Sequence, residues 1–134
     1  MSRTYGMSPT KVLRCVLGSV VVALGLVACG GASGPTPTLP ADVGLAVKAV
    51  PSLRFDASSY TAQAGDVVVG YVNEDSVRHT LIIAKDGTKV ADFKLVVPRK
   101  NTVDSASVKL AAGEYTLLCD VPGHQNMKAT LTVK

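Results

Sequence analysis

The chain has 134 residues, of which 47% are hydrophobic and 18% are charged. This composition fits one folded domain with a hydrophobic core, and it excludes a disordered, highly charged chain. The formal net charge is +4, but three basic residues lie in the first 14 positions, and without them eleven basic residues stand against ten acidic ones, which gives no basis for nucleic-acid binding.

The first segment, residues 1–28, is typical of a secretory signal peptide. Arg3, Lys11 and Arg14 precede the apolar run CVLGSVVVALGLVA (15–28), and the segment contains no acidic residue. The run is about 14 residues long, which is shorter than the roughly 20 residues that a transmembrane helix needs. We therefore expect this segment to direct export rather than to remain as a membrane-spanning anchor.

The apolar run ends in LVAC (26–29), which resembles a bacterial lipobox. In such a motif the cysteine is acylated with fatty acids such as palmitate and becomes the new N-terminus. The alternative is an ordinary signal peptide cleaved near the same alanine, which would leave Cys29 as a free thiol in an oxidising compartment. Lipidation explains the cysteine, so we expect Cys29 to anchor the protein to a membrane in the cell envelope, outside the cytoplasm.

Residues 29–44 comprise this cysteine and the stretch GGASGPTPTLPADVG, which is rich in Gly, Pro, Ser and Thr and has no apolar periodicity. The composition predicts a flexible tether. Its 15 residues would span about 20 Å as a random coil and about 45 Å as an extended polyproline II segment. The folded domain is therefore expected to comprise residues 45–134, without an internal repeat or a second domain.

From residue 45 onward, short runs of β-type composition are bounded by turn residues, and no 3.6-residue apolar periodicity persists over ten residues. Short strands at about ten-residue spacing predict an all-β fold, a Greek-key β-sandwich or barrel of about eight strands. The expected strands are 45–50, 53–57, 66–73, 79–84, 89–95, 102–110, 114–119 and 128–134.

Alternation along the later strands predicts which side chains face the core. Tyr115, Leu117 and Cys119 share one face of their strand, and Leu131 and Val133 share one face of theirs. Because the chain has two Phe, four Tyr and no Trp, the core must consist mostly of aliphatic side chains. The simplest interpretation of Cys119 is thus a small buried hydrophobic residue.

The number of cysteines shows whether Cys119 can form a disulfide. Cys15 leaves with the signal peptide and Cys29 carries the lipid, so Cys119 has no partner for an internal disulfide. It opens the stretch CDVPGHQNM (119–127), which brings a thiol, an imidazole and a thioether within nine residues.

His79 and His124 are the two histidines of the chain, and both are expected at strand ends. A lone histidine in such a place is usually structural or solvated. Two imidazoles with the Cys119 thiolate and a weak axial thioether from Met127, however, form the ligand set of a blue-copper site. Zinc competes for Cys and His, but methionine is not one of its usual ligands.

The number of available ligands also limits the kind of copper centre. A dinuclear copper centre would need a second cysteine in the loop, and copper oxidases and reductases need further histidines that the chain lacks. These residues therefore predict one mononuclear copper ion that cycles between Cu(I) and Cu(II), in a protein that is not an enzyme.

The stretch GEYTLLCDVPGHQNMKATLTV (113–133) is similar to the C-terminal copper-binding strand, loop and strand of small cupredoxins, the plastocyanin, azurin and amicyanin group. The segment VNEDSVRHTLII (72–83) resembles the part of these proteins that provides the first histidine. The resemblance implies a cupredoxin-like fold, with His79 as the distant imidazole ligand, Cys119 as the thiolate, His124 as the second imidazole and Met127 as the axial thioether.

Three details around these ligands affect the expected site. The spacing Cys-x4-His-x2-Met combines an azurin-like first interval with an amicyanin-like second one, which could strain or lengthen the bond to Met127. Thr80 replaces an Asn that pins the ligand loop in several cupredoxins, so we expect Thr80 to pin it less. Pro122 removes an N–H near the sulfur, which would raise the reduction potential, although Pro122 and Gly123 form a turn in either case and the turn by itself can explain them.

The resemblance implies a membrane-tethered carrier of single electrons, which we expect to be a monomer. Its redox partners would dock near His124, on a mostly uncharged patch that includes Val121, Pro122 and Gln125. The first alternative is a copper-binding lipoprotein that buffers copper or delivers it to a terminal oxidase. The second is a metal-free adhesion module, against which the presence of all four ligand types argues.

Overall fold

The computed structural model describes residues 36–134, which form ten β-strands. No helix in this part of the chain is long and apolar enough to cross a membrane. The strands are β1 (Leu45–Val50), β2 (Arg54–Phe55), β3 (Ser59–Ala62), β4 (Gly65–Asn73), β5 (His79–Lys85), β6 (Thr88–Lys89), β7 (Leu95–Val97), β8 (Val103–Leu110), β9 (Gly113–Leu118) and β10 (Lys128–Val133).

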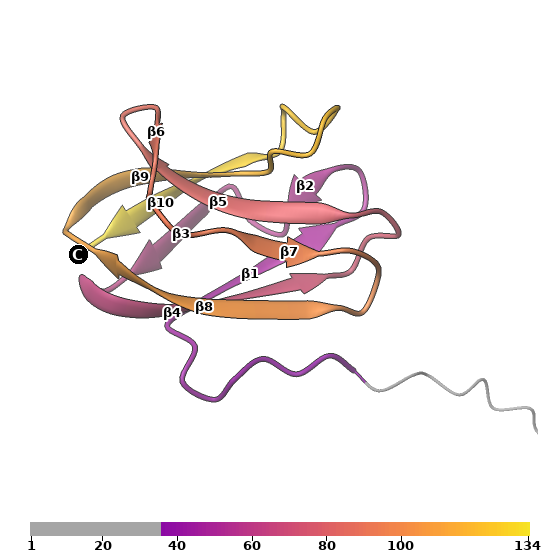
Figure 1. The fold of residues 1–134 in the computed structure, drawn as a ribbon, viewed down its shortest axis with the longest axis horizontal. Coiled ribbons are helices and arrows are strands. Elements are labelled where there is room, and N and C mark those ends of the chain that lie inside the picture. Colours follow the sequence, from indigo (N-terminus) through magenta and orange to yellow (C-terminus); the bar gives the residue numbers. More distant parts are fainter. Residues whose placement is uncertain (1–35) are drawn as a thin grey trace, which may run out of the picture. The chain divides into compact units, whose positions relative to one another are not determined.

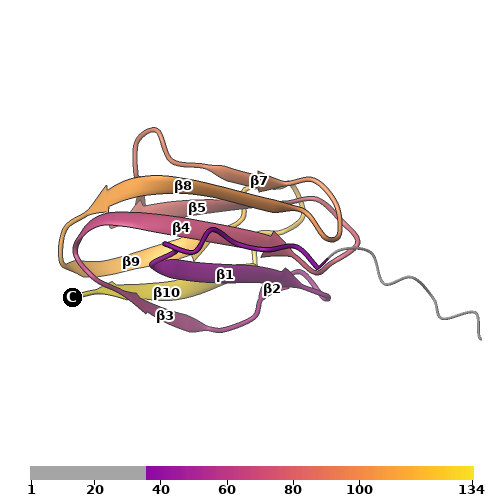
Figure 2. The same ribbon diagram turned by 90° about the horizontal axis from the view of Figure 1, so that it is seen from below.

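The strands form two sheets that face each other, as Figures 1 and 2 show in two perpendicular views. The first sheet has the order β2-β1-β4-β8, and the second has the order β3-β10-β9-β5-β6, with β7 also paired to β5. Two pairs, β1 with β4 and β3 with β10, are parallel, and the others are antiparallel. The chain crosses repeatedly between the sheets, which confirms the predicted all-β Greek-key sandwich.

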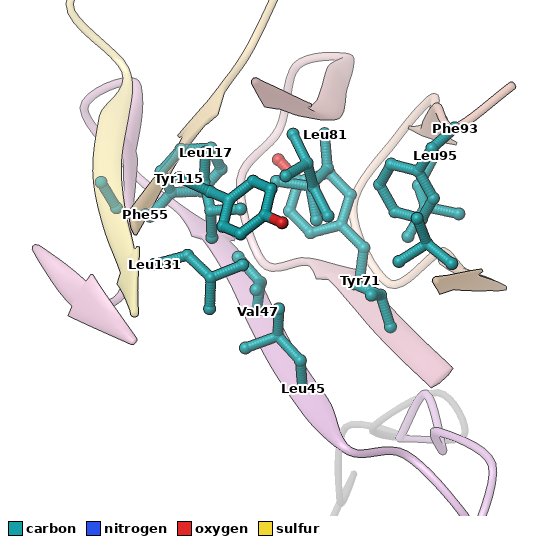
Figure 3. Close-up of a cluster of buried hydrophobic side chains, with 14 of the residues drawn as sticks. Leu45, Val47, Phe55, Tyr71, Leu81, Phe93, Leu95, Tyr115, Leu117 and Leu131 are labelled. Atoms are coloured by element: carbon teal, nitrogen blue, oxygen red, sulfur yellow. The ribbon is translucent and has the colours of Figure 1, made fainter. Parts of the chain in front are cut away.

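The core lies between the sheets and is built by the alternation that the sequence predicts. On β9 and just after it, Tyr115, Leu117 and Cys119 are buried whereas Thr116 is exposed. Leu131 on β10 is buried against them from the neighbouring strand (Figure 3). Aliphatic side chains dominate this cluster, as the composition requires, so the two sheets pack as one continuous core.

The structure differs from the predicted strands at two places. The expected strand 89–95 is divided into β6 and β7, because Asp92 adopts a left-handed backbone (φ 55°) and turns the buried Phe93 into the core. The strand β3 was not expected, because its sequence SYTA is short and half polar. It forms through parallel pairing with β10, a contact between distant segments.

Residues 39–44, called the strap below, belong to the predicted tether but lie against the first sheet. The N–H of Gly44 donates to the Val68 carbonyl oxygen (2.9 Å), and the side chains of Leu39 and Val43 cover Gly70. A Cβ at Gly70 would lie 2.6 Å from Leu39 Cδ2, so the absent side chain makes the room for the strap.

The strap also determines where the described chain begins relative to the two sheets. Followed backwards from Gly44, it runs along β4 from Val68 to Gly70. Thr36 and Leu39 then line a cavity of about 780 Å³ together with Val72 and Glu74 and neighbouring residues. The described chain therefore begins beside the end of β4 that leads into the β4–β5 loop and His79.

Four connections meet at this end of the sandwich, which we call the loop end. They are the β1–β2 turn (51–53), the β4–β5 loop (74–78), the β7–β8 loop (98–102) and the β9–β10 loop (119–127). Figure 1 shows the β9–β10 loop, in yellow, at the same end as the β4–β5 loop. All residues predicted to bind metal lie in or beside these connections.

Candidate metal centre at the loop end

His79 is the first residue of β5 and is completely buried. Pairing of β5 with β7 places His79 opposite Val97. The ring nitrogen Nε2 lies 3.0 Å from Asp75 Oδ2, whereas Nδ1 has no hydrogen-bond partner among the described residues. A buried polar atom without a partner is unusual, so Nδ1 points to an interaction that residues 36–134 do not supply.

The loop before His79 is held by Asn73, which is also completely buried. The Asn73 side-chain amide donates to the Val77 carbonyl (2.7 Å) and to the Val97 carbonyl (3.1 Å). Its oxygen accepts a hydrogen bond from the Asp75 N–H (2.8 Å). Asn73 thus uses both of its polar groups to fix the path of the loop and the position of Asp75.

The loop between β9 and β10 consists of two consecutive turns. The His124 N–H donates to the Val121 carbonyl (3.0 Å), and the Met127 N–H donates to the His124 carbonyl (2.9 Å). Pro122 and Gly123, whose φ is 91°, occupy the central positions of the first turn, as in a type II turn. A bond from the Cys119 N–H to the Met127 carbonyl (3.2 Å) closes the loop. The predicted turn at Pro122–Gly123 is confirmed.

These two segments bring three predicted residues together. The ligand atoms of His79, Cys119 and His124 lie within 4.8 Å of one another. Cys119 Sγ is 3.6 Å from His124 Nδ1, and the two imidazole rings are 4.9 Å apart between centroids, at 48°. Met127 is buried in the same loop, with 1% of its surface exposed.

The residues present fit a copper ion. Asp75 Oδ2 can only accept a hydrogen bond, so Nε2 of His79 must carry the proton, and in a neutral ring Nδ1 then offers a lone pair. A cysteine sulfur and two imidazoles form a donor set suited to copper. No group in the described part of the chain satisfies His79 Nδ1, and a metal ion between these three residues would do so.

Thr80, which the sequence predicted beside the ligands, contacts the sulfur of this cluster. Its N–H donates to Cys119 Sγ (3.4 Å), and its Oγ1 lies 3.5 Å from the same sulfur. The hydroxyl also donates to Asp120 Oδ1 (2.6 Å) and accepts from the Asp120 N–H (3.0 Å). Thr80 therefore pins the start of the β9–β10 loop to β5, although we expected it to do so less than Asn.

Three titratable groups near the cluster have shifted pKa values. Burial by itself raises the pKa of Asp75, but hydrogen bonds from His79 and from the Ser76 N–H outweigh burial and lower it. The hydrogen bonds from Lys94 and Thr80 lower the pKa of Asp120. Burial, followed by the nearby His79, lowers the pKa of His124, which favours a neutral imidazole at that position.

The surface of the loop end carries apolar side chains. Leu53 (37% exposed) and Val77 (42%) are the exposed large hydrophobic residues of the described chain, and both lie in loop-end connections. Leu53 lines a small cavity of about 160 Å³ together with His124 and Met127. The sequence prediction missed both residues, because a single apolar residue in a turn gives no signal of its neighbours.

The remaining predicted residues lie on the β9–β10 loop or outside the described part of the chain. Val121 is half-buried, and Pro122 and Gln125 are exposed on the β9–β10 loop. Cys29, with the predicted signal peptide and lipidation, lies outside the described residues. Within the described part of the chain Cys119 is a free, buried cysteine.

The sequence from residue 41 to residue 134 matches the family model described as copper binding proteins, plastocyanin/azurin family. No curated protein sequence matches the chain significantly. Among solved structures, auracyanin B is 23% identical, with a TM-score of 0.55 over 72% of this chain and 91% of auracyanin B.

Two further solved structures have the same fold. A reduced variant of amicyanin is 18% identical, with a TM-score of 0.53 over 72% of this chain and 86% of amicyanin. An azurin from the obligate methylotroph Methylomonas sp. strain J is 16% identical, with a TM-score of 0.55 over 70% of this chain and 99% of that azurin. At these identities the likeness concerns the fold.

Proposed function

Because the chain belongs to the plastocyanin/azurin family of copper-binding proteins, we propose that it is a membrane-tethered type 1 copper protein that carries single electrons between redox partners in the cell envelope. The observation that carries this proposal is the cluster of His79, Cys119 and His124, in which the buried His79 Nδ1 has no hydrogen-bond partner within residues 36–134. We assign these three residues as the ligands and Met127 as a weak axial ligand.

The fold itself holds the three donors in place. His79 is fixed by β5 and by Asp75, Cys119 by Thr80, and His124 by the turn that begins at Val121. Bound copper would supply reversible one-electron exchange between Cu(I) and Cu(II). Because the donors are held by the fold, the protein needs little rearrangement when the charge of the site changes. This property suits electron transfer rather than catalysis, so we propose no enzymatic activity.

The apolar surface of the loop end supports docking of a redox partner beside His124. His124 is half-buried, whereas His79 is completely buried, so His124 is the imidazole nearer to a docked protein. Leu53 and Val77 extend the predicted patch around Val121 and Pro122. A small, mostly uncharged contact of this kind suits the weak, short-lived encounters of redox proteins. We propose that a single domain, acting as a monomer, provides this surface.

The position of the strap is evidence for a tethered carrier whose loop end stays close to the proposed lipid anchor at Cys29. The described chain begins beside Glu74, at the loop end, and seven positions separate Thr36 from Cys29. Seven residues span at most about 25 Å when fully extended. If Cys29 carries the lipid, partners that are themselves bound to the membrane would be within reach of His124.

Copper loading of the purified protein tests the proposal. Addition of Cu(II) to residues 30–134 is expected to give an intense thiolate-to-copper absorption band and narrow copper hyperfine splitting. The same band should be missing in Cys119→Ser, which keeps the approximate shape of the side chain but not the thiolate. A colourless protein, or colour that survives this substitution, would contradict the assigned centre.

Loss of copper separates a carrier from a protein that buffers or delivers copper. The ligands are buried, with 0% of His79 and 5% of Cys119 exposed, which predicts slow exchange. A carrier should show reversible one-electron voltammetry and release Cu(I) slowly to a chelator. Fast and complete transfer of Cu(I) to the chelator, without a stable redox couple, would favour copper delivery instead.

A further inference from the structure

The partner of the buried His79 is a carboxylate with two fixed donors. Asp75 Oδ2 accepts from His79 Nε2 (3.0 Å), and Asp75 Oδ1 accepts from the Ser76 N–H (2.7 Å). The Asp75 backbone is itself held by Asn73 Oδ1. Asp75 is buried, so water has little access to either bond. Each oxygen of this carboxylate therefore accepts from a donor whose position the fold determines, and Oδ1 also lies 3.4 Å from the Ser76 hydroxyl.

A side chain at position 75 satisfies both donors, His79 Nε2–H and the Ser76 N–H, only if it has two acceptor atoms. The Ser76 N–H is a backbone donor and cannot change its role. His79 is different, because a neutral imidazole carries its proton on either Nε2 or Nδ1. The proton must be on Nε2 to reach Asp75 Oδ2, and this choice leaves Nδ1 free beside Cys119 and His124. The hydrogen bond thus selects the form of His79 that can act as a ligand.

We propose that Asp75 is the positioning residue of the metal centre: its carboxylate holds His79 as the Nε2–H tautomer, and an amide of the same shape cannot replace it. The role is separate from binding, since Asp75 Oδ2 contacts Nε2 and not the unpartnered Nδ1. The effect on copper rests on the proposed function, whereas the effect on the His79 tautomer does not.

The substitution Asp75→Asn gives the sharpest test, because asparagine has the same shape but one acceptor and one donor. If its oxygen accepts from the Ser76 N–H, its NH₂ group faces His79 Nε2. That nitrogen must then act as an acceptor, which moves the ring proton to Nδ1 and blocks the ligand atom. If the amide turns round, the Ser76 N–H loses its partner. Either arrangement disfavours the tautomer that the metal requires.

The tautomer of His79 can be measured in the metal-free protein by nitrogen-15 NMR of the imidazole ring. The wild-type chain is expected to show Nε2–H, Asp75→Asn a population with Nδ1–H, and Asp75→Glu, which keeps the carboxylate, mainly Nε2–H. Copper affinity of Asp75→Asn should fall by about 10–100-fold, the range found for partners of metal-binding histidines. If Cu(II) affinity falls tenfold more than Cu(I) affinity, the potential rises by 59 mV.

Glu74→Gln is the matched control. Glu74 is the neighbouring carboxylate, but it pairs with Lys48 at the surface (2.8 Å) rather than with a histidine. The Glu74→Gln variant should therefore have the same His79 tautomer and the same copper affinity as the wild-type protein. Urea unfolding of each variant establishes that it is folded, and Asp75→Glu covers the case in which Asp75→Asn does not fold.

The results separate the two proposals. The role of Asp75 is overturned if folded Asp75→Asn keeps Nε2–H and full copper affinity, if Asp75→Glu loses Nε2–H, or if Glu74→Gln has the same effect as Asp75→Asn. The proton of His79 can move to Nδ1 in Asp75→Asn although the wild-type protein never develops the thiolate-to-copper band. This combination would support the role of Asp75 and overturn only the proposed copper function.

Discussion

Thr80 joins the two segments that carry the candidate ligands. Through its amide and hydroxyl it contacts both Cys119 and Asp120, while the Asp120 carboxylate also pairs with Lys94 (2.8 Å). Within the described residues, the Thr80 N–H is the backbone amide that donates to the Cys119 sulfur. That the proline in the loop removes a further donor to this sulfur stays a prediction, and fewer such bonds would raise the reduction potential.

Substitution of Thr80 by Val tests this pinning, because valine keeps the shape and removes the hydroxyl. The variant leaves the Asp120 N–H without its acceptor, so we expect the free energy of unfolding to fall by about 1–2 kcal/mol. Urea denaturation measures the change. Thr116→Val, at an exposed position of β9, is the control and should stay within about 0.5 kcal/mol. Equal losses in both variants would remove Thr80 from this role.

Two buried tyrosines provide a second prediction at the same scale. The Tyr115 hydroxyl donates to the Ala111 carbonyl (2.9 Å), whereas the Tyr71 hydroxyl has no partner among the described residues. Tyr115→Phe should therefore cost about 1 kcal/mol, and Tyr71→Phe should be neutral or stabilising. Thermal and urea unfolding of both variants compare them directly. A clear loss of stability in Tyr71→Phe would show that its hydroxyl makes a hydrogen bond after all.

At the scale of elements, the spacing of the predicted ligands follows from two turns. The first turn places His124 three residues after Val121, and the second places Met127 three residues after His124, so the loop closes on Cys119. The mixed spacing that looked unusual in the sequence is thus a regular local structure. The strap is a second local device, because it covers the β4 glycine at position 70 with Leu39 and Val43.

Substitution of Gly70 by Val tests the strap. The new side chain would occupy the space of Leu39 Cδ2, which lies 2.6 Å from the first added atom. We expect the strap to detach, with faster hydrogen exchange at the Gly44 N–H and faster proteolysis within residues 36–43. Gly44→Ala is the control, since its added atom meets Val67 at 3.5 Å, an ordinary contact. Unchanged exchange in Gly70→Val would mean that the strap does not depend on this space.

At the scale of the whole molecule, the candidate site lies at one end of the core, and two of its residues, Cys119 and Met127, belong to the core cluster. The core between the sheets consists of aliphatic and aromatic side chains, and the candidate ligands lie at one end, where four connections meet. Rigid strands thereby position residues on loops, a common arrangement for binding sites. The strap brings the N-terminal side of the domain to the same end.

Membrane attachment is the prediction that concerns the whole chain. Cys29→Ala should abolish incorporation of labelled palmitate, because the acylated sulfur is lost, whereas Cys15→Ser should retain it. Cells grown with labelled palmitate and analysed by immunoprecipitation provide the measurement. Label that persists in Cys29→Ala would place the lipid elsewhere or rule out lipidation at this motif.

Much of the fold could be predicted because strand alternation and turn residues are local properties of the sequence. The strand at residues 45–50 was predicted with its exact bounds, whereas the strand β3 and the break at Asp92 were not. β3 exists through pairing with β10, and the turn at Asp92 is followed by Phe93, which is buried in the core. Both depend on contacts between distant segments, for which local patterns carry no signal.

For the candidate site, the sequence by itself determined the donor types, since Cys119, His124 and Met127 lie within one loop and the only other histidine of the chain is His79. It could not show that the loop before β5 returns Asp75 to His79, or that Thr80 reaches Cys119 across 39 positions. The tertiary structure decided these contacts, because the pairing of β5 with β9 brings the two segments together. Chemical identity is local to the chain, whereas the orientation of a ligand depends on neighbours that only folding supplies.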